Sequence, residues 1–326
     1  MPDAEFIEHL AQQVLAIAQR LPEIFSVPGG NFYWPYLVSN LLLAVTLSAW
    51  IARRQCPWPA SLRSTLGQLV TFDRSLVHDL GLLLGNIFLL QLLLQTLLLS
   101  AGTVENQVAE WLTGRFAPPQ AGRLLAPEAR VFLVTAAAFL AADLGFYVSH
   151  RLQHEIPFLW EFHKVHHCAP HLNPFTVFRR HPVDYVIDHL VMGSLLGLTL
   201  ASADFVFDDY HVFTIWHQNL GYFLFALLGA HLQHSHVWLS WGKLDTLFVS
   251  PATHQIHHST APQHWDRNYG NVLSLWDRLG GTLALPRDGK PPAYGLGDPR
   301  EQTEYGSLLR LYLLPFRKCW RRCGFG

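Results

Sequence analysis

Charged side chains are scarce in this sequence. Asp, Glu, Lys and Arg make up 14% of the 326 residues, whereas hydrophobic residues make up 50%. An average soluble domain carries roughly 25% charged residues. The composition therefore argues against an ordinary soluble domain and favours a membrane protein.

An excess of charge of either sign is also missing. The 23 Lys and Arg residues nearly balance the 24 Asp and Glu residues, and the formal net charge is -1. Such a chain has no global basic field to attract a polyanion. We therefore expect no nucleic-acid partner.

Paired cysteine motifs and a cleavable leader are absent as well. The spacing of the cysteines contains no CxxC, which excludes a zinc ribbon and a disulfide framework, so we expect reduced thiols. The first 30 residues carry four acids and a single Arg. This pattern does not fit a cleaved signal peptide. The cysteines are Cys56, Cys168, Cys319 and Cys323.

Three apolar runs approach the length of a membrane-spanning helix. A hydrocarbon core of about 30 Å needs roughly 17 to 25 helical residues. Runs of this order lie at 36–52, 80–101 and 131–149. The intervening segment 102–130 contains Pro118, Pro119, Gly122 and Pro127, and we expect a turn-rich connection there.

Two further stretches, 186–203 and 212–232, are apolar but interrupted by polar side chains. They either span the membrane or enter and return, because polar groups at membrane depth normally face the interior of a bundle. The short link between them predicts a helical hairpin. The interrupting residues are Asp188, His189, His217 and Asn219.

Basic residues cluster in three segments, and the positive-inside rule places all three on the cytoplasmic side. With five crossings, the histidine-rich segments then also face the cytoplasm. We expect an all-α fold: a multi-pass transmembrane bundle in an inner membrane or ER-type membrane, with a cytosolic histidine-rich helical cap. The basic residues are Arg53, Arg54, Arg63 and Arg74, then Lys164, Arg179 and Arg180, and finally Arg317, Lys318, Arg321 and Arg322.

Histidine is the residue present in excess, with 19 copies. Three boxes, HRLQH at 150–154, HKVHH at 163–167 and HQIHH at 254–258, space their histidines three or four residues apart. Such residues share one helix face, so their imidazoles can bind a common cation. The candidate ligands and catalytic residues are His150, His154, His163, His166, His167, His254, His257 and His258.

Eight imidazoles exceed the needs of one ion. Zinc takes four ligands in a structural site and three plus water in a catalytic site, so a dinuclear site is the economical interpretation. Imidazole binds Fe, Cu, Zn and Ni, and spacing alone does not select the metal. The Glu-x-x-His pairs of soluble di-iron bundles are absent from this sequence.

Two other classes of function compete with an oxidoreductase. A non-catalytic membrane protein that binds or transports zinc would string its ligands along a path through the spans. A membrane haem protein would place histidines at facing mid-membrane positions, for which His189, His211 and His217 are the candidates.

The motifs HRLQH, HKVHH, RRHPVD, LQHSHV, SPATHQIHHS and NYGNVLSLWDRLGGT follow one another between about 130 and 285. In this order they resemble the fatty acid hydroxylase and sterol desaturase superfamily. The resemblance implies a membrane-embedded helical fold with a di-iron site on the cytoplasmic side, O2 as co-substrate and oxidation of a lipid C–H bond. It also implies electrons from a separate donor, either cytochrome b5-like or a ferredoxin with its reductase.

The resemblance extends the set of metal ligands. The family's HisSerAsn-like element maps onto His234, and its HisPro-acid element maps onto His181. His236 replaces the usual Asn, so either His236 or His231 is a candidate supplementary ligand. Two other departures are Gly280 in place of Phe and Asp184 in place of Glu.

The expected organisation follows from these features. Residues 1–129 form an N-terminal region with about two transmembrane helices, 130–285 the catalytic domain, and 286–326 a basic C-terminal tail. The expected substrate is a fatty acyl chain, a sterol-like lipid or another isoprenoid lipid.

Carboxylates and tryptophans complete the expectations. Ligating histidines usually donate their second ring proton to a carboxylate or carbonyl, and an acid within a membrane helix such as Asp143 is costly unless it is paired. The candidate partners of the histidines are Asp184, Asp245, Asp266 and Asp277, and the expected interface anchors are Trp34, Trp160, Trp238 and Trp241.

Overall fold

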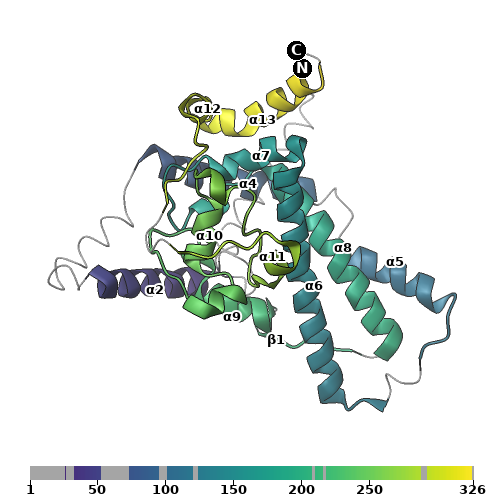
Figure 1. Ribbon diagram of the computed structural model, residues 1–326. Coiled ribbons are helices and arrows are strands. Elements are labelled where there is room, and N and C mark those ends of the chain that lie inside the picture. The colour runs from purple at the N-terminus through teal and green to yellow at the C-terminus, as the bar shows by residue number, and fades with distance from the viewer. Residues whose placement is uncertain are drawn as a thin grey trace.

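The computed structural model describes residues 26, 33–52, 73–94, 101–119, 124–207, 210–215, 218–287 and 292–324. Within these ranges the chain is mostly helical (Figure 1). The strands found there form one short antiparallel pair, β1 (Thr214–Ile215) and β2 (Gln218–Asn219). The helical class expected from the sequence therefore holds, with this small hairpin as an addition.

Two long helices, α6 (Pro127–Glu155) and α8 (Pro182–Phe207), dominate the fold. Among the described helices, these two are long and apolar enough to cross a membrane by length and composition. They contain the apolar runs 131–149 and 186–203. They lie side by side in Figure 1, and at Gly145 a Cβ would lie only 2.8 Å from the Cα of Met192.

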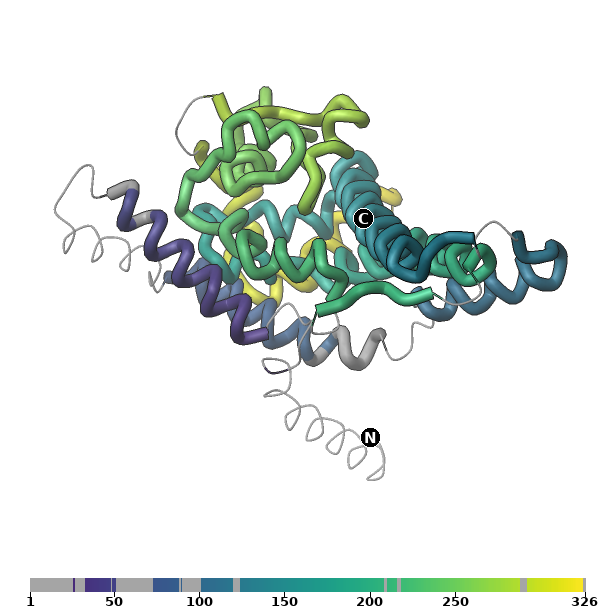
Figure 2. The backbone as a smooth tube through the Cα atoms, turned by 90° about the horizontal axis from the view of Figure 1, so that it is seen from below, coloured from purple at the N-terminus to yellow at the C-terminus, as the bar shows by residue number. Residues whose placement is uncertain are grey.

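The other N-terminal apolar runs also form helices. The run 36–52 lies in α2 (Trp34–Ala52), which packs against α9 (Leu220–Leu228). The run 80–101 begins in α4 (Arg74–Leu94), and its residues 95–100 lie outside the described part of the chain. Figure 2 shows α2 in purple along one side of the molecule and the segment after α9, in green to yellow-green, gathered on another.

The second helix of the expected hairpin does not form as predicted. The chain after α8 enters β1 and β2, and α9 (Leu220–Leu228) begins only after Asn219, whose side chain accepts a hydrogen bond from the Gly221 amide at 2.9 Å. Nine helical residues rise about 14 Å, which is less than half of a hydrocarbon core of about 30 Å. A single helix over 212–232 therefore does not form, because the helix begins only after the cap at Asn219. Of the two expected alternatives, spanning or entering and returning, this finding excludes the spanning helix.

The segment 102–130 also differs from the expected loop. Helix α5 (Ala101–Thr113) occupies its first part and packs along α8. The turn residues begin only at Gly114, so the Pro and Gly signals describe the second half of the segment. The close approach of α5 to α8 requires a glycine at position 197, where a Cβ would lie 2.7 Å from the Cβ of Val104.

The C-terminal segment is folded onto the helices rather than extended. It contains α12 (Pro299–Glu304) and α13 (Leu308–Arg322). Tyr305 and Leu311 join a buried cluster with Leu82 of α4 and Val165 of α7 (Pro157–His167). The tail therefore shares the core of the helices that carry the histidines.

Three cations that the sequence placed in a cytoplasmic loop lie in the interior. Arg179 is 1% exposed and pairs with Asp79, and Arg180 pairs with Asp188 at 2.6 Å. Lys164 pairs with Glu161 at 3.1 Å. These ion pairs explain the three cations without reference to membrane orientation, while Arg53, Arg54 and Arg63 lie outside the described residues.

Candidate metal centre

Nine histidines converge where three helices meet. The end of α6, helix α7 and the short helix α10 (Pro251–His257) each carry one box, and His234 follows the 3-10 helix η3 (Ala230–Leu232). The nine form two groups, in each of which the potential ligand atoms lie within 4.8 Å of one another. Group A comprises His150, His154, His163, His167 and His257, and group B comprises His166, His234, His254 and His258.

Each HxxHH box is divided between the two groups. His163 and His167 belong to group A, whereas His166 between them belongs to group B. In the third box the assignment is reversed, since His254 and His258 belong to group B and His257 to group A. Adjacent helical residues point about 100° apart, so one box can serve two neighbouring sites. The sequence interpretation, which gave each box a single three-nitrogen face, did not foresee this division.

Group B has the geometry of a cation cage. The Nε2 atom of His234 lies 3.1 Å from Nε2 of His166, 3.0 Å from Nε2 of His254 and 3.1 Å from Nε2 of His258. All four rings are buried. Four nitrogens at these separations surround a point that a metal ion with bonds of about 2.0–2.1 Å to imidazole nitrogen can occupy.

Group A also presents unsatisfied ring nitrogens. The Nε2 atoms of His154, His167 and His257 are buried and have no hydrogen-bond partner within the described residues. Buried polar atoms are nearly always hydrogen-bonded, and an orphan atom in a native site calls for an explanation such as an ion. Three orphan nitrogens in one group fit a metal ligand set.

Backbone carbonyls orient several of the rings. The Nδ1–H of His150 donates to the carbonyl oxygen of Tyr269 at 2.8 Å, and that of His257 donates to Arg267 at 2.8 Å. In group B, the Nδ1–H of His166 donates to the carbonyl of Arg179 at 3.1 Å. Because an oxygen acceptor requires the proton on Nδ1, the Nε2 lone pair of each ring is left for a metal.

Two of the four candidate carboxylates face histidine rings. Oδ2 of Asp184 lies 3.4 Å from Nδ1 of His163, and Oδ1 of Asp266 lies 3.8 Å from Nδ1 of His154. Asp184 is buried, whereas the side chain of Asp266 is 68% exposed. Asp245 instead accepts hydrogen bonds from Ser240 and from the Trp241 amide.

Asp277 and Asp143 act on the site through one loop. Asp277 accepts hydrogen bonds from the amides of Tyr269 and Gly270 at 2.8 and 2.7 Å. Asp143, buried in α6, accepts from the amides of Val272 and Leu273, both at 3.1 Å. The two carboxylates thereby fix the loop whose Tyr269 carbonyl orients His150.

Burial keeps the imidazoles neutral. Desolvation, followed by repulsion from neighbouring imidazoles, lowers the pKa of His166 and His258 well below the usual 6.5. Desolvation lowers the pKa of His254 to about 3. A neutral imidazole is the metal-binding form, so the cluster is ready to bind cations near neutral pH.

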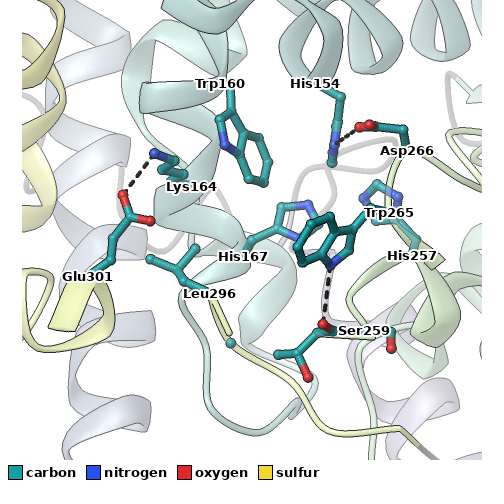
Figure 3. A pocket seen from close by; sticks show the side chains of 12 residues that line it. His154, Trp160, Lys164, His167, His257, Ser259, Trp265, Asp266, Leu296 and Glu301 are labelled. Atoms are coloured by element: carbon teal, nitrogen blue, oxygen red, sulfur yellow. Dashed lines mark hydrogen bonds and ion pairs between the residues drawn. The ribbon is translucent and has the colours of Figure 1, made fainter. Parts of the chain in front are cut away.

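A cavity of about 320 Å³ opens onto group A (Figure 3). Among the described histidines, those that line it are His154, His167 and His257, all of group A. In Figure 3, Lys164 faces Glu301 on one side of the cavity and Asp266 faces His154 on the other. The remaining wall consists of Trp160, Ser259, Thr260, Trp265, Gly295 and Leu296.

Trp160 belongs to the site rather than to a membrane anchor. Its ring centroid lies 4.8 Å from that of His154 and 5.3 Å from that of His167. The sequence interpretation assigned it to the interface because Trp favours the membrane boundary. Its place immediately before the second box, on the same helix as His163, was the available signal.

Two proposed ligands lie outside both groups. His181 donates from Nε2 to the carbonyl of Tyr312 at 3.0 Å and accepts the Val183 amide at Nδ1, so both of its ring nitrogens are engaged. His231 is buried with its ring centroid 5.7 Å from that of Phe178. His236 is also outside the two groups.

Several contributors to the site had no recognisable sequence signal. The carbonyl groups of Arg179, Arg267 and Tyr269 act through the backbone, so side-chain identity does not reveal them. Glu301 comes from the segment expected to be a tail. At Gly280, where the family usually has Phe, a side chain would collide with the Tyr147 hydroxyl, so Tyr147 fills the space.

Buried histidines from three boxes, together with His234, form a histidine-box site able to hold metal ions at the end of an apolar helix. Residues 135–282 match the model of the family described as fatty acid hydroxylase. This matched region is a fatty acid hydroxylase domain that covers slightly less than half of the chain, and it confirms the resemblance of the motifs to the fatty acid hydroxylase and sterol desaturase superfamily.

Curated relatives are similar to part of the chain. Alkylglycerol monooxygenase of Danio rerio is 32% identical over 185 residues, which cover 57% of this chain and 37% of the relative. Ornithine lipid hydroxylase of Rhizobium tropici is 32% identical over 145 residues, covering 44% and 40%. Delta(7)-sterol 5(6)-desaturase of Candida albicans is 28% identical over 152 residues, covering 46% and 33%.

The matched region thus spans 33% to 40% of the length of these relatives. No solved structure matches the chain significantly.

Proposed function

We propose that the protein is a membrane oxidoreductase that uses two iron ions and O2 to hydroxylate or desaturate a lipid. The observation that carries this proposal is the pair of adjacent histidine groups, of which one opens to a cavity. The names of the relatives, a monooxygenase, a hydroxylase and a desaturase of lipids, support it.

The two groups would hold the two ions. The five imidazoles of group A would bind one ion and the four of group B the other, with Nε2 as the donor where Nδ1 is hydrogen-bonded to a carbonyl. His181 and His231 would then support the surrounding packing. Bound iron would supply the activation of O2 needed to remove hydrogen from an unactivated C–H bond, which acid–base side chains cannot achieve.

The overall reaction requires an external reductant. Hydroxylation places one oxygen atom of O2 in the lipid and releases the other as water, consuming two electrons and two protons. Desaturation removes two hydrogen atoms from the lipid and releases both oxygen atoms as water, with the same two electrons. The proposed donor is a cytochrome b5-like protein or a ferredoxin with its reductase.

The cavity favours a substrate that carries a polar group near the oxidised carbon. Lys164, Glu301 and Asp266 place charges on the cavity wall, and Trp160 and Trp265 place indole rings there. A bare hydrocarbon chain would desolvate these charges without compensation. We therefore propose that a lipid headgroup, such as those of the alkylglycerols and ornithine lipids named for the relatives, enters this cavity.

The proposed setting is a multi-pass helical bundle with the histidine cap on the cytoplasmic side. Helices α6 and α8 support it, because both are apolar and long enough to span, and because Phe132, Leu140 and Leu198 are exposed on them. Residues 1–129 would supply about two more transmembrane helices, 130–285 the catalytic domain and 286–326 the C-terminal segment. The membrane is an inner membrane or of ER type.

The alternative of a zinc carrier is not favoured, because the named relatives are oxidoreductases. A zinc carrier would also not explain a cavity that opens onto one group alone.

Lipid mass spectrometry tests the proposed reaction. Cells that produce the protein should accumulate a lipid with one added oxygen atom or two fewer hydrogen atoms, and cells that produce His257→Ala should not. His264→Ala serves as a matched control, because His264 lies outside both groups and hydrogen-bonds Ser259. Unchanged lipids together with purified protein that contains zinc and no iron would overturn the proposal.

A further inference from the structure

Helix α13 has three distinct faces. Its inner face buries Leu311, Pro315 and Cys319 against the rest of the molecule. On this side Leu308 and Tyr312 lie close to Gly81 and Gly85 of α4, where a Cβ would meet them within 3.0 Å. The helix is therefore fixed in rotation, and its outer residues are held in defined directions.

The first outer face is an apolar stripe. Leu309, Leu313, Phe316 and Trp320 follow one another at intervals of four, three and four residues, and each side chain is more than half exposed. Phe316 forms the inner edge of this stripe, because its ring centroid also lies 5.0 Å from that of Phe162. This interval places them along one line of the helix. Four large apolar side chains gathered on one exposed line, beside polar residues, mark an interaction surface rather than scattered surface residues.

The second outer face is a basic stripe parallel to the first. Arg310, Arg317 and Arg321 each follow an apolar-stripe residue by one position, so the two lines lie about 100° apart. None of the three makes an ion pair within the described residues. By contrast, Lys318 pairs with Glu301 and Arg322 pairs with Glu161.

The two stripes border a shared groove. A shallow cavity of about 500 Å³ is lined by Leu309 and Leu313 from the apolar stripe and by all three arginines of the basic stripe. Leu314, Lys318 and Glu304 complete its lining, and there the charge of Glu304 is balanced by its ion pair with Lys318 at 2.8 Å. No acidic residue occurs between residues 308 and 322. The groove therefore offers guanidinium groups to an anion beside side chains suited to hydrocarbon.

We propose that the outer half of α13 docks on the surface of an anionic lipid bilayer. A helix with adjoining apolar and basic faces lies in the interface plane, with its apolar residues among the upper acyl chains and its cations at the headgroups. Clustered arginines beside such a helix are attracted to anionic lipids. A protein partner is disfavoured because it would have to present hydrocarbon and anions in parallel lines, which a bilayer does by its nature.

The test measures whether α13 contacts lipid in the full-length protein. An environment-sensitive fluorophore is attached at Leu313→Cys, with Cys56 and Cys323 replaced by Ser, in nanodiscs of phosphatidylcholine with or without phosphatidylglycerol. Nitroxide-labelled lipids quench the probe on contact. The control probe stands at Leu279→Cys on α11 (Leu275–Gly280), a leucine that is 73% exposed elsewhere on the molecule.

We expect the Leu313 probe to be quenched in discs that contain phosphatidylglycerol, and the Leu279 probe to be quenched much less. Replacing Arg310, Arg317 and Arg321 together by Gln should lower the ratio of docked to undocked helix roughly 100-fold, about fivefold for each cation. Circular dichroism and metal content should not change, because the three side chains make no internal ion pair.

Two outcomes would overturn the proposal. One is a Leu313 probe that is quenched no more than the control in either lipid. The other is a Leu313 probe in detergent that becomes shielded from solvent as the protein concentration rises. That result would show that a second copy of the chain covers this face. Neither outcome involves catalysis, so the proposed oxidation can fail or succeed independently.

Discussion

Groups A and B are built from the same side chain but differ in access. Three of the five imidazoles of group A line a cavity, whereas all four of group B are enclosed and none lines that cavity. Ring chemistry alone therefore does not define the role of each site. If the two groups hold ions as proposed, substrate would approach the ion of group A, and the ion of group B would lie behind a closed wall.

The largest expected effect is on metal content and activity when one histidine is removed from either group. His258→Ala leaves group B with three imidazoles, and we expect loss of that ion and at least about 100-fold lower activity. His154→Ala leaves group A with four imidazoles, so most of that metal should remain. Elemental analysis per protein chain distinguishes the two variants, with His264→Ala as the unaffected control. Equal metal loss from both would show that the groups do not act as separate sites.

A second comparison concerns the carboxylates behind the rings. Asp184 is 1% exposed beside His163, whereas Asp266 is exposed and stands farther from His154. Asp184→Asn should weaken metal binding roughly 10- to 100-fold, because such partners orient the ligand and raise its basicity. Asp266→Asn should change it much less. Competition with a chelator measures both affinities, and a larger effect at Asp266 would reverse the assigned order.

Acid should destabilise the metal-free protein. Burial lowers the pKa of His254 to about 3, while the unfolded chain titrates near 6.5. The unfolded state then binds more protons below about pH 6.5, so the free energy of unfolding falls as the pH drops, by up to about 1.4 kcal/mol per pH unit for each such histidine. Thermal unfolding across this range measures the slope.

Two variants isolate the origin of that slope. His254→Gln removes one buried imidazole and should make the dependence shallower. Leu279→Gln should leave it unchanged, because this substitution at a leucine that is 73% exposed removes no titratable group. A slope that His254→Gln does not alter would place the acid sensitivity outside the histidine groups.

The smallest expected effect lies at the cavity wall of group A. Glu301 pairs with Lys164 at 2.8 Å, and Glu301→Gln should leave the ammonium group paired with Glu161 alone, so that it interacts more strongly with substrate or water. We expect KM to change severalfold with kcat nearly constant, since no metal ligand is altered. Glu304→Gln is the control, because Glu304 pairs with Lys318 and does not line the cavity. A fall in kcat alone would place Glu301 in the chemical step.

The sequence predicted correctly that the histidines of the three boxes converge. It did not predict how these histidines are divided between groups A and B. Spacing by three and four residues brings ring nitrogens to one side of a helix, and this physical rule applies to all three boxes. The division of His163, His166 and His167 between two groups depends on how α7 faces α10, which is a tertiary relation. His181 looked equivalent to the others as a residue type, yet its nitrogens are used by Val183 and Tyr312.

Helix lengths were predictable where composition alone decides them. Helices α6 and α8 contain long apolar runs, and the run in α8 remains helical although Asp188 and His189 interrupt it. The stretch 212–232 is equally apolar in composition, but one Asn at position 219 changes where its helix starts. The N-terminal runs could be placed as helices, although hydropathy gave no information on which elements they contact.

The C-terminal segment limits how far the chain can be shortened without altering the cavity next to group A. The region that matches the family model ends at residue 282, yet Gly295, Leu296 and Glu301 border the chamber above group A. Gln302 and Tyr294 anchor that border to the Cys168 carbonyl and to Gln255. A fragment trimmed at residue 282 would keep every imidazole and lose one side of the chamber. Under the proposed function, residues 283–326 would therefore contribute to substrate preference although they contain no histidine.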